Sequence, residues 1–307
     1  MISRRLRLLG GIIRPLARHH LARAQDPVRE RRSFSLVSRL FFRQPTKLRT
    51  RPELRFQPGD DPSLWVSAGP TRPGKVLLYL HGGGFLVGSP RTHAAMVGTI
   101  SALSGLCAFI PSYRLAPEHR LPAALEDAID AHQFLLSEGF APQDIIIGGD
   151  SAGGGLAFGL LAHLCQTGQR PAAVFAFSPF VDQTFSGASV AENAATDHFF
   201  PTERLADLPD MILDGLPAQD PRISPLFAEF PDPPPVMIQA SSVEILRDDA
   251  VRMTQKLRAA GGQVILQLWD GAPHVWQLLD GWFPEARAAL IVTANFIRHQ
   301  LPPEGEN

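Results

Sequence analysis

The sequence predicts an α/β protein with a mostly parallel central sheet flanked by helices. Short apolar runs alternate with segments of helical periodicity along most of the 307 residues, which is typical of this class. The consecutive Ile145, Ile146 and Ile147 indicate a strand that is apolar on both faces, as strands inside parallel sheets are. A hydrophobic fraction of 45% and a charged fraction of 19% agree with an ordinary soluble globular chain.

The chain begins with two expected helices. They are separated near Asp26, which is followed by proline, and the second ends before Pro45. Residues 53–57 and 64–67 then form an expected hairpin, because the stretch between them is rich in Pro, Gly and Asp.

Strands and helices alternate from there to the C-terminus. The expected strands are residues 76–80, 107–111, 145–147, 172–177, 236–240 and 264–269, and the expected helices are residues 93–103, 122–138, 156–165, 248–260 and 284–299. Residues 182–223 interrupt the alternation without a clear strand. Because this insertion follows the carboxyl end of a strand, we expect it beside the mouth of the functional site. Residues 302–307 are expected to fray.

The net charge of −1 hides an uneven distribution. Residues 1–55 contain 15 Lys and Arg and three acids, a net of +12, whereas the rest of the chain has a net of −13. Such asymmetry indicates either contact with nucleic acid or a membrane, or a helical segment packed on an acidic body. We favour packing, because apolar residues at helical spacing give the segment a face to bury. These residues are Leu6, Leu8, Leu9, Ile12, Ile13 and Leu16.

Further features of the sequence concern membrane spans, metal sites and the cellular compartment. No apolar run approaches the ~20 residues needed to span a bilayer, and the ten histidines show no metal-ligand spacing. The short apolar run 8–13, bracketed by arginines, does not fit a secretory signal, while the Arg-rich start leaves a transit peptide as a secondary hypothesis. Cys107 and Cys165 lie in apolar segments and are expected to be buried free thiols, compatible with the cytoplasm.

Residues 149–153, Gly-Asp-Ser-Ala-Gly, fit the pattern G-x-S-x-G between an expected strand and an expected helix. In this setting the serine occupies a strained turn, which exposes its Oγ at the top of the sheet. The alternative is an ordinary glycine-rich turn. The flanking strand and helix favour a nucleophilic role for Ser151, with the Ala152 N–H beside it.

A serine nucleophile needs a base, and that base needs an acid to hold it. His274 follows the last expected strand, in a loop at the edge of the sheet where Ser151 also lies. Glu244 lies in the loop after the strand 236–240, whereas Asp248 and the next acid open a helix, where acids are favoured as caps. We therefore take Glu244 as the candidate acid and Asp248 as the reserve.

A glycine-rich loop, residues 81–84 (His-Gly-Gly-Gly), directly follows the strand 76–80. In an HGGG-type loop the backbone N–H groups approach the substrate and stabilise an oxyanion. The alternative is a glycine-rich loop without a special function. The presence of the serine motif in the same chain argues against this alternative.

Four motifs in this order resemble the hormone-sensitive-lipase-like (family IV) carboxylesterases of the α/β-hydrolase superfamily, over about residues 53–300. The motifs are His-Gly-Gly-Gly-Phe at 81–85, Tyr-Arg-Leu-Ala-Pro-Glu-His at 113–119, Gly-Asp-Ser-Ala-Gly at 149–153, and the pair Glu244 and His274. That family usually has Asp at the first position of an Asp-x-Leu-x-Asp motif, thirty residues before the histidine. Here Glu244 takes that position and Asp248 matches the second acid.

The resemblance implies an α/β-hydrolase fold with a helical cap. Residues 1–50 and 182–223 would supply the cap, and residues 51–181 and 224–307 the catalytic core. It also implies an oxyanion hole, formed by the N–H groups of Gly83, Gly84 and Ala152.

The expected function is that of a cytoplasmic serine carboxylesterase, which cleaves short- to medium-chain acyl esters through an acyl-enzyme. No cofactor or metal is expected. The expected partner is a small-molecule ester, with no nucleic acid and no membrane span, and a homodimer is possible. An amidase or arylformamidase with the same triad is one alternative. A non-catalytic small-molecule receptor on the same fold, like the plant hormone receptors, is another, but those lack the working histidine that this chain keeps at His274.

Overall fold

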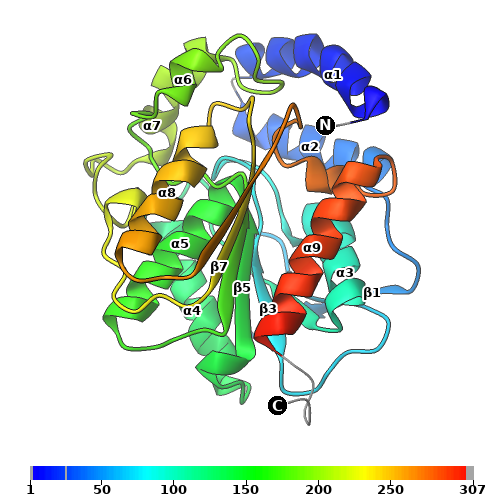
Figure 1. Ribbon diagram of the computed structural model, residues 1–307, viewed down its shortest axis with the longest axis vertical. Helices are drawn as coiled ribbons and strands as arrows, with labels where there is room; N and C mark the ends of the chain where they lie inside the picture. The colour runs from blue at the N-terminus through cyan, green and yellow to red at the C-terminus, as the bar shows by residue number, and fades with distance from the viewer. Residues whose placement is uncertain (1–2, 25, 302–307) are drawn as a thin grey trace.

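The computed structural model describes residues 3–24 and 26–301, and its centre is an eight-stranded sheet in the order β1-β2-β4-β3-β5-β6-β7-β8 (Figure 1). β1 (Leu48–Glu53) and β2 (Ser63–Ala68) pair antiparallel, and β2 also runs antiparallel to β4. The parallel strands are β4 (Cys107–Ile110), β3 (Val76–Leu80), β5 (Ile145–Asp150), β6 (Ala173–Phe177), β7 (Val236–Ser241) and β8 (Val264–Trp269). The expected α/β class and the mostly parallel sheet are confirmed.

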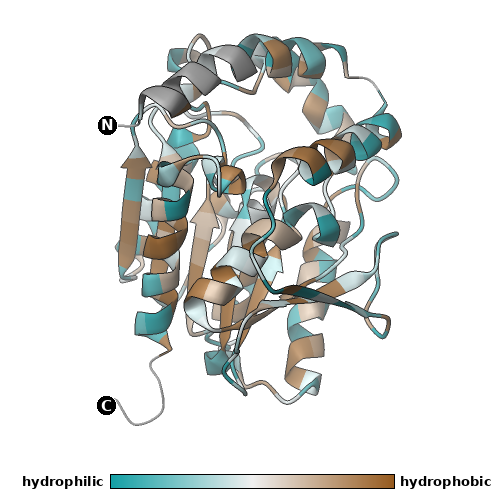
Figure 2. Cartoon of the chain, turned by 90° about the vertical axis from the view of Figure 1, so that its right-hand side faces the viewer, coloured by the Kyte–Doolittle hydropathy of each residue, from teal (hydrophilic) through white to brown (hydrophobic). Residues whose placement is uncertain are grey.

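Helices cover both faces of the sheet (Figure 1). One layer consists of α3 (Pro90–Ser104) and α9 (Pro284–Gln300), and the other of α4 (Ala123–Ser137), α5 (Ser151–Gln166) and α8 (Arg247–Ala259). Along β3, Val76 and Leu78 pack with the second layer, while Leu77 and Tyr79 pack with the first. Alternate side chains thus enter two separate cores, which explains why this strand is apolar at every position. Figure 2 shows hydrophobic residues along the strands of the sheet, with helices lying in front of part of it.

The two expected N-terminal helices are present as α1 (Arg4–Arg23) and α2 (Pro27–Phe41). Asp26 separates them, and its side chain accepts from the Val28 N–H at 2.9 Å, which caps α2. Of the apolar residues expected to face the protein, Leu6 is buried but Leu16 is 67% exposed, so that expectation was wrong for Leu16. The side chains of Leu8, Leu9, Ile12 and Ile13 lie outside the described ones.

The insertion at residues 182–223 contains α6 (Ser189–Glu192), α7 (Leu208–Ile212) and the short 3₁₀ helix η2 (Thr202–Asp207), and no strand of the sheet passes through it. It contacts α1 directly. Arg18 Nη1 donates to the Ala194 carbonyl at 2.7 Å, and Arg204 Nη1 donates to the Ala22 carbonyl at 2.7 Å. The two segments expected to form a cap therefore lie against each other above the sheet (Figure 1).

Several further expectations differ from the structure, among them the helix expected to begin at residue 156, which begins at Ser151 as α5, directly after β5. The first strand of the hairpin ends at Glu53 instead of beginning there. It is an exposed edge strand of polar residues, and it tolerates Pro52 because an edge position needs no further hydrogen bond. α3 begins three residues early, because Ser89 and Thr92 form a capping box. Cys107 and Cys165 are free as expected but half-buried rather than buried.

Within the described part of the chain, no helix combines the length and the apolar character that crossing a bilayer requires. The expected fraying of residues 302–307 falls outside the described residues.

Candidate active site

Ser151 lies where β5 passes directly into α5. Its φ of 51° is in the left-handed region, which costs a non-glycine residue strain of order 1–3 kcal/mol. The neighbouring glycines make the turn feasible. A Cβ on Gly149 would lie 2.3 Å from the Gly153 carbonyl oxygen, and one on Gly153 would lie 2.1 Å from the Leu80 carbonyl oxygen. The serine is therefore held on a tight turn that only this spacing of glycines allows.

The structure joins His274 and Glu244 directly. His274 Nδ1 lies 2.5 Å from Glu244 Oε2, and the other carboxylate oxygen accepts from the Ser241 N–H at 2.7 Å. The side chains are 9% and 1% exposed, respectively. Because an ionised carboxylate can only accept, the tautomer that satisfies this contact has the proton on Nδ1 and the lone pair on Nε2. This tautomer is the one that a general base requires.

The loop that carries His274 folds back from β8 across β7 toward the serine. The Val275 N–H donates to Ser178 Oγ at 3.4 Å, at the end of β6. Two residues further, the Phe180 N–H donates to the Ser151 carbonyl at 3.0 Å. Because β6 is the neighbour of β5, this chain of contacts brings His274 to the same edge of the sheet as Ser151.

Asp248, the reserve acid, is directed elsewhere. Its carboxylate accepts from the Ser189 N–H at 2.9 Å and pairs with Arg247 at 2.8 Å. It thus binds the start of α6, in the insertion, rather than His274. The adjacent Asp249 is buried and accepts from Val181 and Asp182 N–H groups, and its burial raises its pKa to about 8.

The glycine-rich loop after β3 has the backbone freedom that its sequence indicated. Gly83 and Gly84 have φ of 126° and 63°, and a Cβ on Gly83 would lie 2.1 Å from the Val87 carbonyl oxygen. In the described part of the chain, the N–H groups of Gly83 and Gly84 donate no hydrogen bond. Ala152 lies in the first turn of α5, where N–H groups lack an intrahelical acceptor. These donors are available to a ligand.

Asp150 connects this loop to the serine turn. It accepts from the Gly82 N–H at 3.1 Å and from the Tyr79 hydroxyl at 2.8 Å, and His93 Nε2 lies 3.4 Å away. Burial alone would raise the pKa of Asp150, but His93 and these hydrogen bonds outweigh it and the pKa is lowered. Sequence reasoning did not assign this role. A carboxylate at the end of an otherwise apolar strand was the available signal.

His81 and Tyr113 support the loop from behind. The Tyr113 hydroxyl donates to the His81 carbonyl at 2.6 Å, and the two rings stack with centroids 4.2 Å apart. Burial lowers the pKa of His81 to about 3, so its imidazole is neutral at ordinary pH. Its role is therefore to fix the loop and not to transfer protons.

The insertion holds the loop that carries Glu244, a feature the sequence did not reveal. Asn193 Nδ2 donates to the Glu244 carbonyl at 2.8 Å, and Asp197 accepts from the Ile245 N–H at 2.8 Å. Phe200 meets the His274 ring edge-on, with centroids 4.8 Å apart.

Comparison with known proteins identifies the fold family. A family described as having the alpha/beta hydrolase fold matches residues 77–278. An esterase of Acinetobacter venetianus is 36% identical over 224 residues, covering 72% of this chain and 74% of the esterase. An acetyl-hydrolase of Streptomyces hygroscopicus is 36% identical over 226 residues, covering 73% of this chain and 76% of the relative.

Solved structures extend the match to nearly the whole chain. The crystal structure of an esterase from the bacterial hormone-sensitive lipase family has a TM-score of 0.89 at 34% identity, covering 98% of this chain and 99% of that one. The structure of EstE5 soaked with p-nitrophenyl butyrate also has a TM-score of 0.89, at 33% identity, covering 97% and 99% of the two chains. The chain belongs to the α/β-hydrolase fold family, among the hormone-sensitive-lipase-like esterases.

Proposed function

We propose that this protein is a serine carboxylesterase that hydrolyses short- to medium-chain acyl esters, with Ser151, His274 and Glu244 as its triad. The observation that carries the proposal is the buried pair of Glu244 and His274, at the sheet edge that also bears the strained Ser151. Glu244 is longer by one methylene than the aspartate expected at its position, and its carboxylate still reaches His274 Nδ1 at 2.5 Å.

In the proposed reaction, His274 Nε2 takes the proton from Ser151 Oγ as this oxygen attacks the ester carbonyl. The tetrahedral oxyanion accepts from the N–H groups of Gly83, Gly84 and Ala152, while the Glu244 carboxylate stabilises the imidazolium. The carbon–oxygen bond to the alcohol then breaks, and His274 gives its proton to the leaving oxygen. Water attacks the acyl-enzyme with His274 again as the base, which releases the acid and restores Ser151.

Residues 1–50 and 182–223 form the proposed cap over a core of residues 51–181 and 224–307. The contacts of α1 with the insertion support this division, as does Phe200 against His274. One relative is the acetyl-hydrolase of Streptomyces hygroscopicus. Another is an ethyl acetate hydrolase of Pseudomonas putida, which is 29% identical over 259 residues. Both names support small ester substrates for this protein.

A panel of p-nitrophenyl esters from acetate to palmitate tests this function, with Ser151→Ala as the control. We expect kcat/KM to be highest for the short and medium esters and to fall on the order of 10³-fold or more in Ser151→Ala. A fluorophosphonate probe should label the wild type and not the variant. Faster turnover of matched anilides than of esters would favour the amidase alternative, and absence of both turnover and labelling would exclude the proposal.

A homodimer and a cytoplasmic location are part of the proposal. β8 is the edge strand of the described sheet, and Ile265 and Leu268 on it are 50% and 44% exposed. An apolar strand with an unpaired edge is suited to pairing with a second copy. The free thiols of Cys107 and Cys165 are compatible with a reducing compartment.

A further inference from the structure

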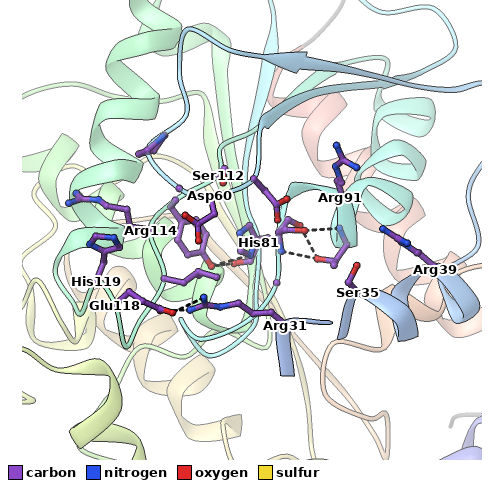
Figure 3. Close-up of a pocket in the computed structure, with 18 residues that line it drawn as sticks. Arg31, Ser35, Arg39, Asp60, His81, Arg91, Ser112, Arg114, Glu118 and His119 are labelled. Atoms are coloured by element: carbon purple, nitrogen blue, oxygen red, sulfur yellow. Dashed lines mark hydrogen bonds and ion pairs between the residues drawn. The ribbon is translucent and has the colours of Figure 1, made fainter. Parts of the chain in front are cut away.

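Arg31, on α2, extends from the N-terminal helices to Glu118, in the segment that follows β4 (Figure 3). Its Nε donates to the Leu86 carbonyl at 2.9 Å, and Nη2 donates to the Ala116 carbonyl at 2.9 Å. The same guanidinium binds both carboxylate oxygens of Glu118, at 3.0 and 2.6 Å. Four of its five N–H groups are thus used, and two of them hold main-chain oxygens of different loops.

One of these loops is the oxyanion loop, residues 81–88. The Leu86 N–H donates to the Gly83 carbonyl at 3.1 Å, while the Leu86 carbonyl accepts from Arg31. The Ala116 N–H donates to the Phe85 carbonyl at 2.9 Å, so the second loop held by Arg31 is also bonded to the first. Arg31 therefore fastens the backbone three residues from a proposed oxyanion donor.

Hydrogen bonds hold the oxyanion loop in place, but its glycines allow the backbone to rearrange when one of these bonds is lost. Gly83, Gly84 and Gly88 have positive φ, and glycine resists a change of backbone angle less than any other residue. A cavity of about 260 Å³ lies against the loop, lined by Arg31, His81 and Gly88 among others. Ser151 is not among its lining residues. Without Arg31, we expect the backbone next to Gly88, which lines the cavity, to shift and to move the donors Gly83 and Gly84 with it.

We propose that Arg31 is a positioning residue that couples the N-terminal cap to the oxyanion donors Gly83 and Gly84. The inference rests on the proposed function and adds that the cap controls the chemical step as well as access to it. A displacement of ~1 Å in a catalytic group can cost ~10²-fold in rate, so a small shift of this loop is enough.

Arg31→Met and Arg31→Lys test the proposal, with Arg32→Met as the matched control. Arg32 is the next residue of α2, is exposed, and makes no side-chain hydrogen bond to another described residue. With p-nitrophenyl butyrate, Arg31→Met should lower kcat ~10- to 100-fold, less than the ~10²- to 10³-fold cost of removing an oxyanion donor outright, and change KM less than ~3-fold. Arg31→Lys should retain an intermediate kcat, because an ammonium keeps the charge but not the fork of donors. Arg32→Met should match the wild type.

Two further readouts separate positioning from a merely structural role. A trifluoromethyl ketone, which forms an oxyanion on the serine, should lose affinity by the same factor as kcat/KM in Arg31→Met. Hydrogen exchange of the segment 82–88 should be faster in Arg31→Met and unchanged in Arg32→Met. A normal kcat, an unchanged ketone affinity or unchanged exchange would each overturn the inference.

Glu118→Gln provides the test should Arg31→Met fail to fold. It leaves Arg31 in place but removes the carboxylate that orients it, and we expect a kcat loss of ~3- to 10-fold, since a charged hydrogen-bond partner is replaced by a neutral one. A normal kcat in this variant would overturn the inference. The proposed function is judged on the wild type alone. If the wild type neither turns over esters nor reacts with fluorophosphonate, that function fails, whereas an active wild type with a normal Arg31→Met overturns only the positioning role.

Discussion

Asn193 Nδ2 donates to the main-chain carbonyl of Glu244 at 2.8 Å. The same amide donates to the Ser242 carbonyl at 3.1 Å, so one buried side chain of the insertion spans the loop that carries the proposed triad acid. The insertion, part of the proposed cap, thus also contacts the loop of the proposed triad acid. It fixes the backbone from which Glu244 reaches His274, which links the proposed cap to the orientation of the base.

Replacing Asn193 by Ala should weaken both stability and catalysis. The buried Glu244 carbonyl and the half-buried Ser242 carbonyl lose their donor, which costs ~1–3 kcal/mol in the free energy of unfolding. We expect kcat/KM to fall ~10-fold, the modest effect of a residue that acts by holding a reacting group in place. Asn295→Ala, on the exposed side of α9, serves as the control for steady-state kinetics and urea unfolding. Unchanged kinetics in a folded Asn193→Ala would contradict the link between the insertion and the acid.

The sequence predicted the sheet best where local signals are strong. β3 and β8 begin and end at the expected residues, because each is an apolar run bounded by turn-forming residues. β1 was misplaced, since its polar residues 48–53 carry no alternation and the strand is defined only by backbone pairing to β2.

The candidate site likewise contains residues with a strong local signal and residues whose contacts are distant in the sequence. Ser151 and the proposed oxyanion glycines belong to short motifs whose residue types and spacing predict a strained turn and a glycine-rich loop. The roles proposed for Asn193 and Arg31 could not be predicted, because they depend on partners 51 and 85 residues away in the chain. Contacts between residues so far apart in the sequence leave no local sequence pattern. Only the folded structure shows that these residues meet.

Stability should fall in mild acid because of His132 on α4. This side chain is buried, neither ring nitrogen has a hydrogen-bond partner in the described structure, and burial, with a smaller effect of His163, lowers its pKa to about 4. The unfolded chain binds a proton near pH 6.5 and the folded chain only near pH 4, so stability declines as the pH falls from 6.5 to 4.

His132→Leu isolates this effect, because it removes the proton site and keeps an apolar side chain of similar volume. The free energy of unfolding, measured in urea at pH 8 and pH 5, should drop less between the two values in the variant than in the wild type. We expect a difference on the order of 1–2 kcal/mol. Equal drops in the two proteins would show that other groups, such as His81, govern the acid sensitivity.

The proposed dimer predicts that a charge on the edge of β8 gives a monomer. Ile265→Lys places an ammonium on the exposed strand, where pairing with a second copy would bury it. Light scattering coupled to gel filtration should give twice the mass of the 33.5 kDa chain for the wild type and one chain for the variant. Lys substitution of Leu36, which is exposed on α2, is the control. A wild type that elutes as a monomer at micromolar concentration would refute the dimer.

The two candidate acids make opposite predictions. Glu244→Gln preserves shape but removes the charge that stabilises the His274 imidazolium, so kcat should fall by several orders of magnitude, ~10⁴-fold in comparable triads, with little change in Tm. Asp248→Asn instead loses a charged acceptor for Arg247 and weakens the bond to the Ser189 N–H, which costs ~1 kcal/mol of stability and leaves kcat within a few-fold. Kinetics and melting curves of both variants decide between them. A nearly normal Glu244→Gln beside an inactive but folded Asp248→Asn would transfer the role to Asp248, against the 2.5 Å contact of Glu244 with His274 Nδ1.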